Sequence, residues 1–222
     1  MISNRRPDRR SFLSALGALG ASAVALSSGV ARADEVSEAL AEITRARAGL
    51  STLVGSFTQE RTIGLLATVV KSEGEMTLVR PDRLRWELRP PDAITYWIGP
   101  EGLAYDSPNG GGSVGKSAAG RFGAVLGDLM TLLGGDLEKL RARYDLSVEK
   151  ADGGLLLGAR PRADEVKRHV KSLSLRLPPD LWSVQRIEIE ESGGDRSVIA
   201  FPRMLRDVKV DPGRMVPPSR AR

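Results

Sequence analysis

Apolar and charged residues alternate along residues 76–88, MTLVRPDRLRWEL, and this alternation constrains the fold more than any other feature of the chain. Every second residue is apolar from Met76 to Leu78 and again over 84–88. Period-two alternation predicts strands with one apolar and one solvated face. Pro81 has no backbone donor and favours a break between the strands, so we expect an antiparallel hairpin. Arg80 then lies at the edge of the apolar face, which indicates a binding surface rather than a reaction centre.

The N-terminus has the features of an export signal. Arg9-Arg10-Ser11-Phe12-Leu13 is a twin-arginine motif, and a weakly apolar run rich in Ala, Gly and Ser extends to Val30. Ala31-Arg32-Ala33 provides a small-x-small cleavage site before Asp34. We therefore expect residues 1–33 to be a removed signal of the twin-arginine type. An uncleaved anchor and export by the Sec route are the alternatives.

Charge and cysteine content exclude several classes of protein. The chain has 33 Lys and Arg against 28 Asp and Glu, but five of the basic residues and one acid lie in residues 1–33. The remaining 28 basic and 27 acidic residues nearly cancel, so the basic balance gives no argument for nucleic-acid binding. Because the chain has no cysteine, it forms no disulfide and carries no acylated N-terminal cysteine.

The rest of the chain predicts a single domain over residues 34–215, followed by a loose tail over 216–222. Helical periodicity predicts helices from Glu35 to about Gly49, over 122–133 and over 136–141. The Gly- and Ser-rich residues 107–121 are expected to be a loop. Strands are expected over residues 52–62, 66–79, 83–89, 93–98, 103–105, 144–150, 154–161, 170–177, 184–190 and 197–201.

These elements predict an α+β fold, because strands dominate and helices fall at the start and in the middle. Neighbouring strands joined by short turns, such as those at Gly153-Gly154 and Gly193-Gly194, form antiparallel pairs. A sheet of this many strands curls. We expect a curved antiparallel sheet with the inserted helices on its concave apolar face.

Several local motifs resemble the LolA family, the periplasmic carriers that move lipoproteins to the outer membrane. They are Ser56-Phe57-Thr58-Gln59, Gly74-x-Met76-x-Leu78-x-Arg80-Pro81, Leu84-x-Trp86, Pro91 and Gly102-x-x-x-Tyr105-x-x-Pro108. The resemblance implies an incomplete β-barrel with an α-helical lid over a hydrophobic cavity for acyl chains. It also implies a monomeric, non-enzymatic protein without cofactors, and as partners acylated lipoproteins, an inner-membrane release complex and an outer-membrane acceptor.

Carried over residue by residue, the resemblance makes Arg80 the latch that holds the lid through hydrogen bonds to lid backbone. From the residues alone, Arg80 is better explained as a sheet-edge arginine paired with an acid, and the apolar set is more often ordinary core than a ligand cavity. The alternative function is a lipid- or lipoprotein-binding sensor that ferries no cargo. The set expected to line the cavity is Phe57, Met76, Leu78, Leu84, Trp86, Trp97, Leu126, Met130 and Leu133.

No pattern predicts catalysis or a metal site. Gly110-x-x-x-x-Gly115-Lys116-Ser117 matches the P-loop pattern, but it lacks the buried strand before it and the coordinating acid that nucleotide binding requires. His169 is the one histidine of the chain and has no Ser–His–acid grouping or metal-ligand spacing around it. Glu188, Glu190 and Glu191 follow a strand pattern with isoleucines between them, which predicts a solvated face.

Overall fold

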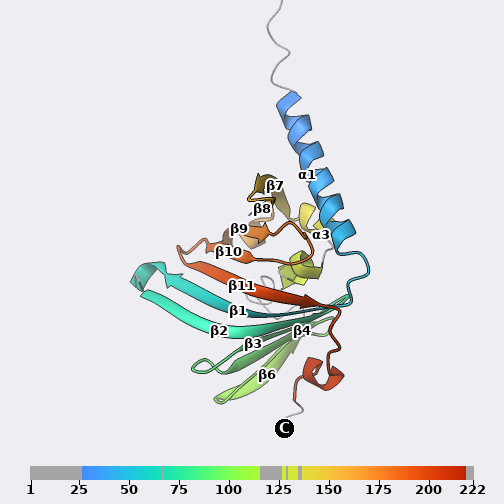
Figure 1. Cartoon of the computed structure of the whole chain (residues 1–222). Helices are drawn as coiled ribbons and strands as arrows, with labels where there is room; N and C mark the ends of the chain where they lie inside the picture. The colour runs from blue at the N-terminus through green and yellow to red at the C-terminus, as the bar shows by residue number, and fades with distance from the viewer. Residues whose placement is uncertain (1–26, 67, 116–126, 129, 135–136, 219–222) are drawn as a thin grey trace, which may run out of the picture.

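The structure, a computed structural model, describes residues 27–66, 68–115, 127–128, 130–134 and 137–218. Its main feature is a sheet of eleven strands, which Figure 1 shows extending from β6 at the bottom of the view to β7 at the top. The strands are β1 (Thr52–Ile63), β2 (Thr68–Val79), β3 (Arg83–Leu88), β4 (Ile94–Gly99), β5 (Gly102–Ser107), β6 (Gly110–Gly115), β7 (Tyr144–Ala151), β8 (Gly154–Pro161), β9 (Val170–Leu177), β10 (Arg186–Glu191) and β11 (Arg196–Arg206).

The sheet is antiparallel throughout and open. Its order is β6-β5-β4-β3-β2-β1-β11-β10-β9-β8-β7, so β6 and β7 are the two edges and do not pair with each other. Neighbours in this order are neighbours in sequence except where β1 pairs with β11. This pairing joins the first and last strands at the centre of the sheet. The predicted α+β class and incomplete barrel are confirmed.

The strand register separates two faces of the sheet. Met76 pairs with Trp86 and Leu78 with Leu84, and residues directly opposite each other project from the same side. We call this side the inner face. Residues one position away, including Thr77 and Arg85, project from the other side, the outer face.

Helices cover the inner face. α1 (Ser27–Ala46) contacts β7 and α3 (Leu137–Arg141), and α4 (Asp164–Lys167) connects β8 to β9. Residues 127–128 and 130–134 are also helical, and we call these seven residues the closing segment. Leu132 and Leu133 of the closing segment have no exposed surface and belong to one core with the inner face. Figure 1 shows α3 beside the end of α1, between the two arms of the sheet.

One segment expected to be a loop contains a strand. Residues 107–121 were expected to form a loop, but Gly110–Gly115 forms the edge strand β6. Its backbone pairs with β5 over six residues, from Ser107–Gly110 to Gly102–Gly115. The glycines carry no side-chain pattern, so backbone pairing with β5 decides the conformation, and periodicity gives no signal. Residues 116–121 lie outside the described residues.

The two ends of the described chain form helices that contact different parts of the domain. α1 begins at Ser27, upstream of the predicted cleavage site, and the first buried side chain among its residues 33–46 is Val36. Near the C-terminus, a short 3-10 helix η2 (Pro212–Met215) contacts β3. Asp211 caps this helix by accepting a hydrogen bond from the Gly213 amide. Among the described helices, none has the length and hydropathy to cross a membrane.

Candidate functional site

The inner face of β1–β3 is strongly apolar and completely covered. Phe57, Met76, Leu78, Leu84 and Trp86 are each at most 4% exposed. They come from three neighbouring strands and share one face through the register. The structure therefore brings together five of the nine residues that the sequence assigned to a cavity.

Three aromatic rings are stacked at the centre of this face. Phe57 and Trp86 lie with ring centroids 4.1 Å apart and 28° between their planes, and Phe201 of β11 contacts both edge-on at 6.0 and 6.3 Å. Gly74 makes room for the Phe57 ring, since a Cβ there would lie 2.4 Å from Phe57 Cζ. Phe201 joins the site because β11 pairs with β1, a contact that sequence reasoning did not include.

The remaining predicted cavity residues fall into three groups. Met130 is partly buried against the core, and Leu133 is fully buried in the closing segment. Leu126 lies outside the described residues. Trp97 does not belong to the inner face, because it pairs with Arg85 and Ala104 on the outer face. Its indole Nε1 donates to the Arg214 carbonyl at 2.9 Å, so η2 covers it.

The closing segment is attached to the rest of the protein by polar contacts at two points. At the first, Arg47 Nη1 donates a hydrogen bond to the Leu132 carbonyl oxygen. Arg47 is 2% exposed, although arginine is rarely buried without a partner charge. Burial, and next the charge of Arg80, lower the pKa of Arg47 to about 10, so the side chain stays a cation at neutral pH.

Arg80, the predicted lid latch, contacts different backbone. Its Nη1 donates to the Arg47 carbonyl at 2.9 Å and to the Leu50 carbonyl at 3.2 Å, at the end of α1. Among the described residues, Arg47 rather than Arg80 reaches the closing segment. Arg80 donates to the backbone carbonyl of Arg47, and the Arg47 side chain donates to the closing segment. Arg80 therefore affects the closing segment through Arg47.

The sequence contained a signal for Arg47 that the periodicity argument passed over. The apolar stripe of the first helix continues through Val36, Leu40 and Ile43 to Leu50, and Arg47 occupies the next helical position of that stripe. A charged residue in the apolar stripe of an amphipathic helix indicates a buried charge with a specific partner.

At the second point of attachment, Asp128 of the closing segment accepts hydrogen bonds from Tyr144 Oη and Arg143 Nη1. Asp128 is 4% exposed. Burial raises its pKa above the ordinary value of 3.8, while the Tyr144 hydrogen bond and the Arg143 charge oppose that rise. The pKa of Tyr144 is also raised, first by its burial and then by the Asp128 carboxylate.

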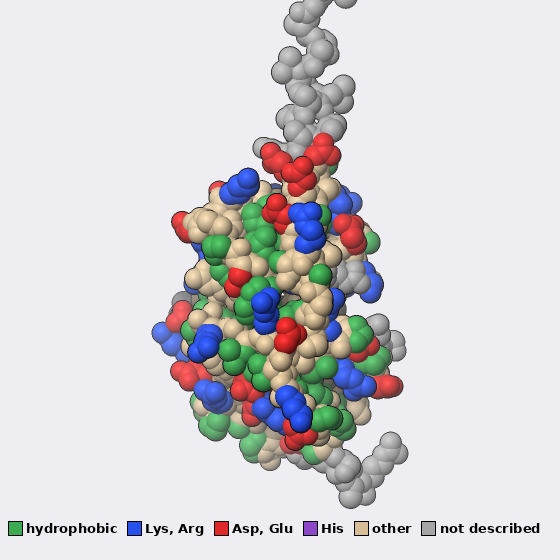
Figure 2. All heavy atoms as spheres, turned by 45° about the vertical axis from the view of Figure 1, so that its right-hand side comes forward, with side chains coloured by type: hydrophobic (Ala, Val, Ile, Leu, Met, Phe, Trp, Pro, Cys, Tyr) green, Lys and Arg blue, Asp and Glu red, His purple; other side chains and the backbone are tan. Residues whose placement is uncertain are grey.

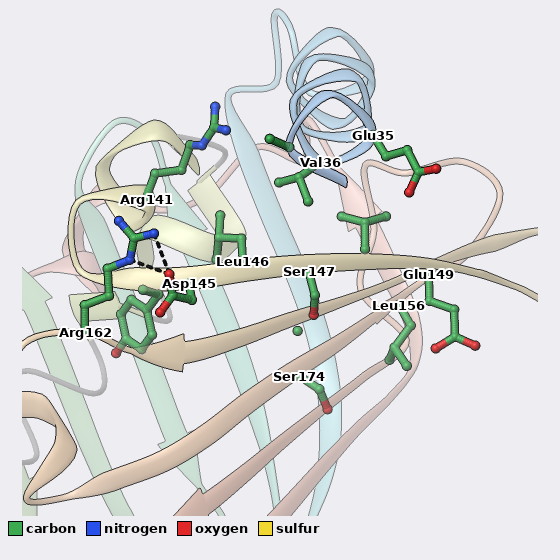
Figure 3. A pocket seen from close by; sticks show the side chains of 14 residues that line it. Glu35, Val36, Arg141, Asp145, Leu146, Ser147, Glu149, Leu156, Arg162 and Ser174 are labelled. Atoms are coloured by element: carbon green, nitrogen blue, oxygen red, sulfur yellow. Dashed lines mark hydrogen bonds and ion pairs between the residues drawn. The ribbon is translucent and has the colours of Figure 1, made fainter. Parts of the chain in front are cut away.

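Hollows also lie outside the Phe57–Trp86 stack. One, of about 670 Å³, lies around the edge strand β7 under α1. Figure 3 shows Val36 of α1 and Leu146 of β7 pointing toward each other, while Ser147 projects from the opposite side of β7 and Ser174 lies on β9. A second, of about 590 Å³, includes Thr58 and Arg176, and a third, of about 230 Å³, lies by the β4–β5 turn and includes Met215.

Charged side chains of both signs lie on the visible face of the protein. Figure 2 shows basic and acidic side chains interspersed over most of this face, with a group of acidic side chains at the top of the view. Glu188 forms ion pairs with Arg186 and Arg196, which accounts for one carboxylate of the predicted solvated face. Within the part of the chain that the structure describes, no three His, Cys, Asp or Glu residues are grouped to hold a metal ion.

The described residues of the P-loop match do not form a phosphate-binding loop. Gly110–Gly115 is an extended edge strand, whereas a phosphate-binding loop curls so that successive amides converge on the anion. Lys116 and Ser117, which complete the pattern, lie outside the described residues.

Comparison with known proteins finds similarity to lipoprotein carriers. The profile of the family described as "Outer membrane lipoprotein carrier protein LolA" matches residues 48–96. An outer-membrane lipoprotein carrier protein of Alkalilimnicola ehrlichii is 26% identical over 182 residues, which span 78% of this chain and 77% of the relative.

Solved structures similar to this chain include three bacterial proteins. A LolA superfamily protein of Nitrosomonas europaea has a TM-score of 0.45 and 9% identity, with 82% of this chain and 97% of that one covered. The Mycobacterium tuberculosis lipoprotein LppX has a TM-score of 0.41 and 15% identity over 79% and 99%. MucB in the Pseudomonas aeruginosa MucA/MucB complex has 0.44 and 13% over 83% and 61%.

The profile match covers the segment that carries Phe57, Arg80 and Trp86, and the carrier relative extends over most of the domain. Over this segment the chain is similar to the LolA family, and over most of its length to a lipoprotein carrier.

Proposed function

We propose that this protein is a periplasmic, non-enzymatic carrier that binds the acyl chains of lipoproteins on its inner face and transfers them from the inner to the outer membrane. The observation that supports this function most is the closing segment. It covers an apolar face of five nearly unexposed side chains, yet its described polar attachments are those of Leu132 and Asp128. Such a cover can leave as a unit and expose the face to a ligand.

The energetics of acyl-chain burial require a cover of this kind. Each buried methylene contributes about 0.8 kcal/mol. Three chains of about 16 carbons, if fully buried, would then bind by roughly 35–40 kcal/mol, well past the limit of about 20 kcal/mol for non-covalent affinity. Release needs an opposing contribution. Separating Leu132 and Leu133 from the inner face, and breaking the Arg47 hydrogen bond, provides one.

The proposed partners follow from the carrier role. An inner-membrane release complex would supply acylated lipoproteins, and an outer-membrane acceptor would take them. The predicted signal over residues 1–33 supports a periplasmic location, and Val36, the first buried residue among residues 33–46 of α1, lies after the predicted cleavage site. The interspersed surface charge in Figure 2 fits a protein that forms short-lived contacts with several partners.

The test is release of newly made lipoproteins from spheroplasts on addition of the purified processed protein. Soluble complexes in the supernatant support a carrier. No release from spheroplasts that respond to a known carrier, with a folded protein, contradicts transfer and favours the sensor alternative. A matched pair of tryptophan variants assigns the face: Trp86→Ala should reduce release and Trp97→Ala should not, because Trp86 lies on the inner face and Trp97 on the outer face.

A further inference from the structure

The Arg47 guanidinium is poorly satisfied in the closed protein. Arginine has five N–H donors, but the described hydrogen bonds of this side chain consist of the one from Nη1 to the Leu132 carbonyl. Its Nε and Nη2 are buried and have no hydrogen-bond partner among the described residues. Buried polar atoms are normally paired, so two orphaned donors on one buried cation are candidates to bind a further acceptor.

The electrostatic surroundings of Arg47 are also uncompensated. Neither Arg47 nor Arg80 forms an ion pair with a carboxylate in the described parts of the chain. The charge of Arg80 lowers the pKa of Arg47, while the carboxylate of Asp180 raises it by a smaller amount. Both Asp180 oxygens already accept hydrogen bonds from Ser183. Two neighbouring cations without an ion-paired carboxylate among the described residues favour a negatively charged ligand.

The site is continuous with the apolar inner face. Arg80 follows Leu78 by two residues, where β2 ends and the turn to β3 begins. Gly134 of the closing segment lies over this turn, because a Cβ at Gly134 would be about 4.0 Å from the Pro81 carbonyl oxygen. Removing the closing segment would therefore expose the two guanidinium groups at one end of the face formed by Leu78, Leu84 and Trp86.

We propose that Arg47, supported by Arg80, receives the anionic group of an acyl-chain ligand in the place that the Leu132 carbonyl occupies in the closed protein. The shared chemistry is an alkyl chain with a carboxylate or phosphate at its end, as in a fatty acid or a glycerophospholipid. The anion accepts hydrogen bonds from Nη1, Nη2 and Nε, and the chain lies along the inner face. This inference rests on the proposed opening of the inner face to acyl chains, and it goes beyond lipoprotein cargo.

The experiment compares matched probes at concentrations below micelle formation, with the protein expressed from the full chain. Dodecanoate is compared with dodecanol, and dioctanoylphosphatidylglycerol with dioctanoylglycerol, by tryptophan fluorescence and calorimetry. Charge-assisted hydrogen bonds predict that an anionic probe binds about 10- to 100-fold more tightly than its neutral partner. The two pairs distinguish a fatty-acid carboxylate from a phospholipid phosphate as the source of the anion.

Arg47→Gln should reduce this preference to within about threefold, while Arg47→Lys should retain part of it. Arg160→Gln is the matched control, because Arg160 is exposed on the outer face and should leave the preference unchanged. Circular dichroism shows whether each variant is folded, and the comparison of two probes within one protein cancels a general loss of affinity.

The outcomes separate the two proposals. Equal binding of anionic and neutral probes by the wild type, or an unchanged preference in folded Arg47→Gln, overturns the anion site and leaves acyl-chain binding standing. Binding of no probe by the folded wild type contradicts both the anion site and the opening of the inner face.

Discussion

Arg47 and Arg80 show how one side chain acts through the backbone of another. Arg80 donates to the carbonyls of Arg47 and Leu50, and Arg47 donates to the Leu132 carbonyl. Burial disfavours the charged form of Arg47, which lowers its pKa to about 10. The buried charge therefore opposes the packing of the closing segment over Arg47.

Replacement of Arg80 by leucine tests whether Arg80 affects the closing segment through Arg47. Arg80→Leu removes the donor to two carbonyls and should lower stability by about 1–3 kcal/mol, without loss of the fold. Because the Arg47 backbone is then released, amide hydrogen exchange of residues 127–134 should become faster. Arg83→Leu serves as the control, since Arg83 is exposed on the outer face. Equal exchange of 127–134 in the wild type and in Arg80→Leu would show that Arg80 does not act on the closing segment.

At the scale of elements, the closing segment depends on a titratable contact. Asp128 is buried against β7, where Tyr144 and Arg143 donate to its carboxylate. Its pKa is raised in the closed state, so the closed state binds a proton more tightly than the open one. Stability of closure is thus full below pH 3.8 and is lost as the pH rises through the raised pKa.

The Asp128→Asn variant should remove this dependence. In the wild type, protection of residues 127–134 against hydrogen exchange, corrected for the intrinsic exchange rate, should fall as the pH rises from 3.8 through the raised pKa. The asparagine cannot ionise, so its protection should stay flat over the same range. Asp145→Asn is the control, since Asp145 lies on the exposed side of β7. A wild-type profile that is flat, or that rises with pH, would contradict the role of Asp128.

The packing of β2 against Phe57 depends on a residue without a side chain. A Cβ at Gly74 would lie 2.1 Å from the Glu87 carbonyl oxygen as well as against the Phe57 ring. Gly74→Ala should therefore destabilise the protein by about 1–3 kcal/mol, measured by urea unfolding. Gly115→Ala on the edge strand β6 has nothing within 4 Å and should be nearly neutral. Equal midpoints for the two variants would refute the close approach.

On the scale of the whole molecule, the two faces of one sheet are covered by different parts of the chain. The inner face carries the aromatic cluster and its helical cover, whereas η2 lies on the outer face of β3 and β4. Arg214 of η2 forms an ion pair with Glu75 at 2.8 Å, and its carbonyl accepts from Trp97. The C-terminal residues therefore support the sheet from the side that the proposed ligand does not contact.

Deletion of residues 210–222 tests this separation of the faces. Loss of η2 should lower stability by about 1–2 kcal/mol, which for a chain of this size lowers Tm by roughly 2–8 °C. Binding of dodecanoate should remain within about twofold of the wild type, because the inner face is unchanged. A large loss of binding by the folded truncated protein would show that the two faces are coupled.

The sequence pattern alone predicts the antiparallel sheet and the position of most strands. It also predicts that Met76, Leu78, Leu84 and Trp86 lie on the inner face. Alternation within one strand fixes which side chains share a face, and this information is local. The prediction for Trp97 failed because its parity is set by the register with β3, where it pairs with Arg85. Strand β6 was missed for a related reason, since its glycines pair through the backbone alone.

The arginine that reaches the closing segment is set by long-range contacts of the folded chain. Arg47 and Leu132 are 85 residues apart, and their contact exists because the helices inserted between β6 and β7 fold back over the inner face. The contact of Phe201 with Phe57 and Trp86 likewise depends on the pairing of the first strand with the last. Local periodicity predicts which face of the sheet a residue occupies. Long-range pairing determines which residues contact that face, because chain closure brings together segments that share no sequence pattern.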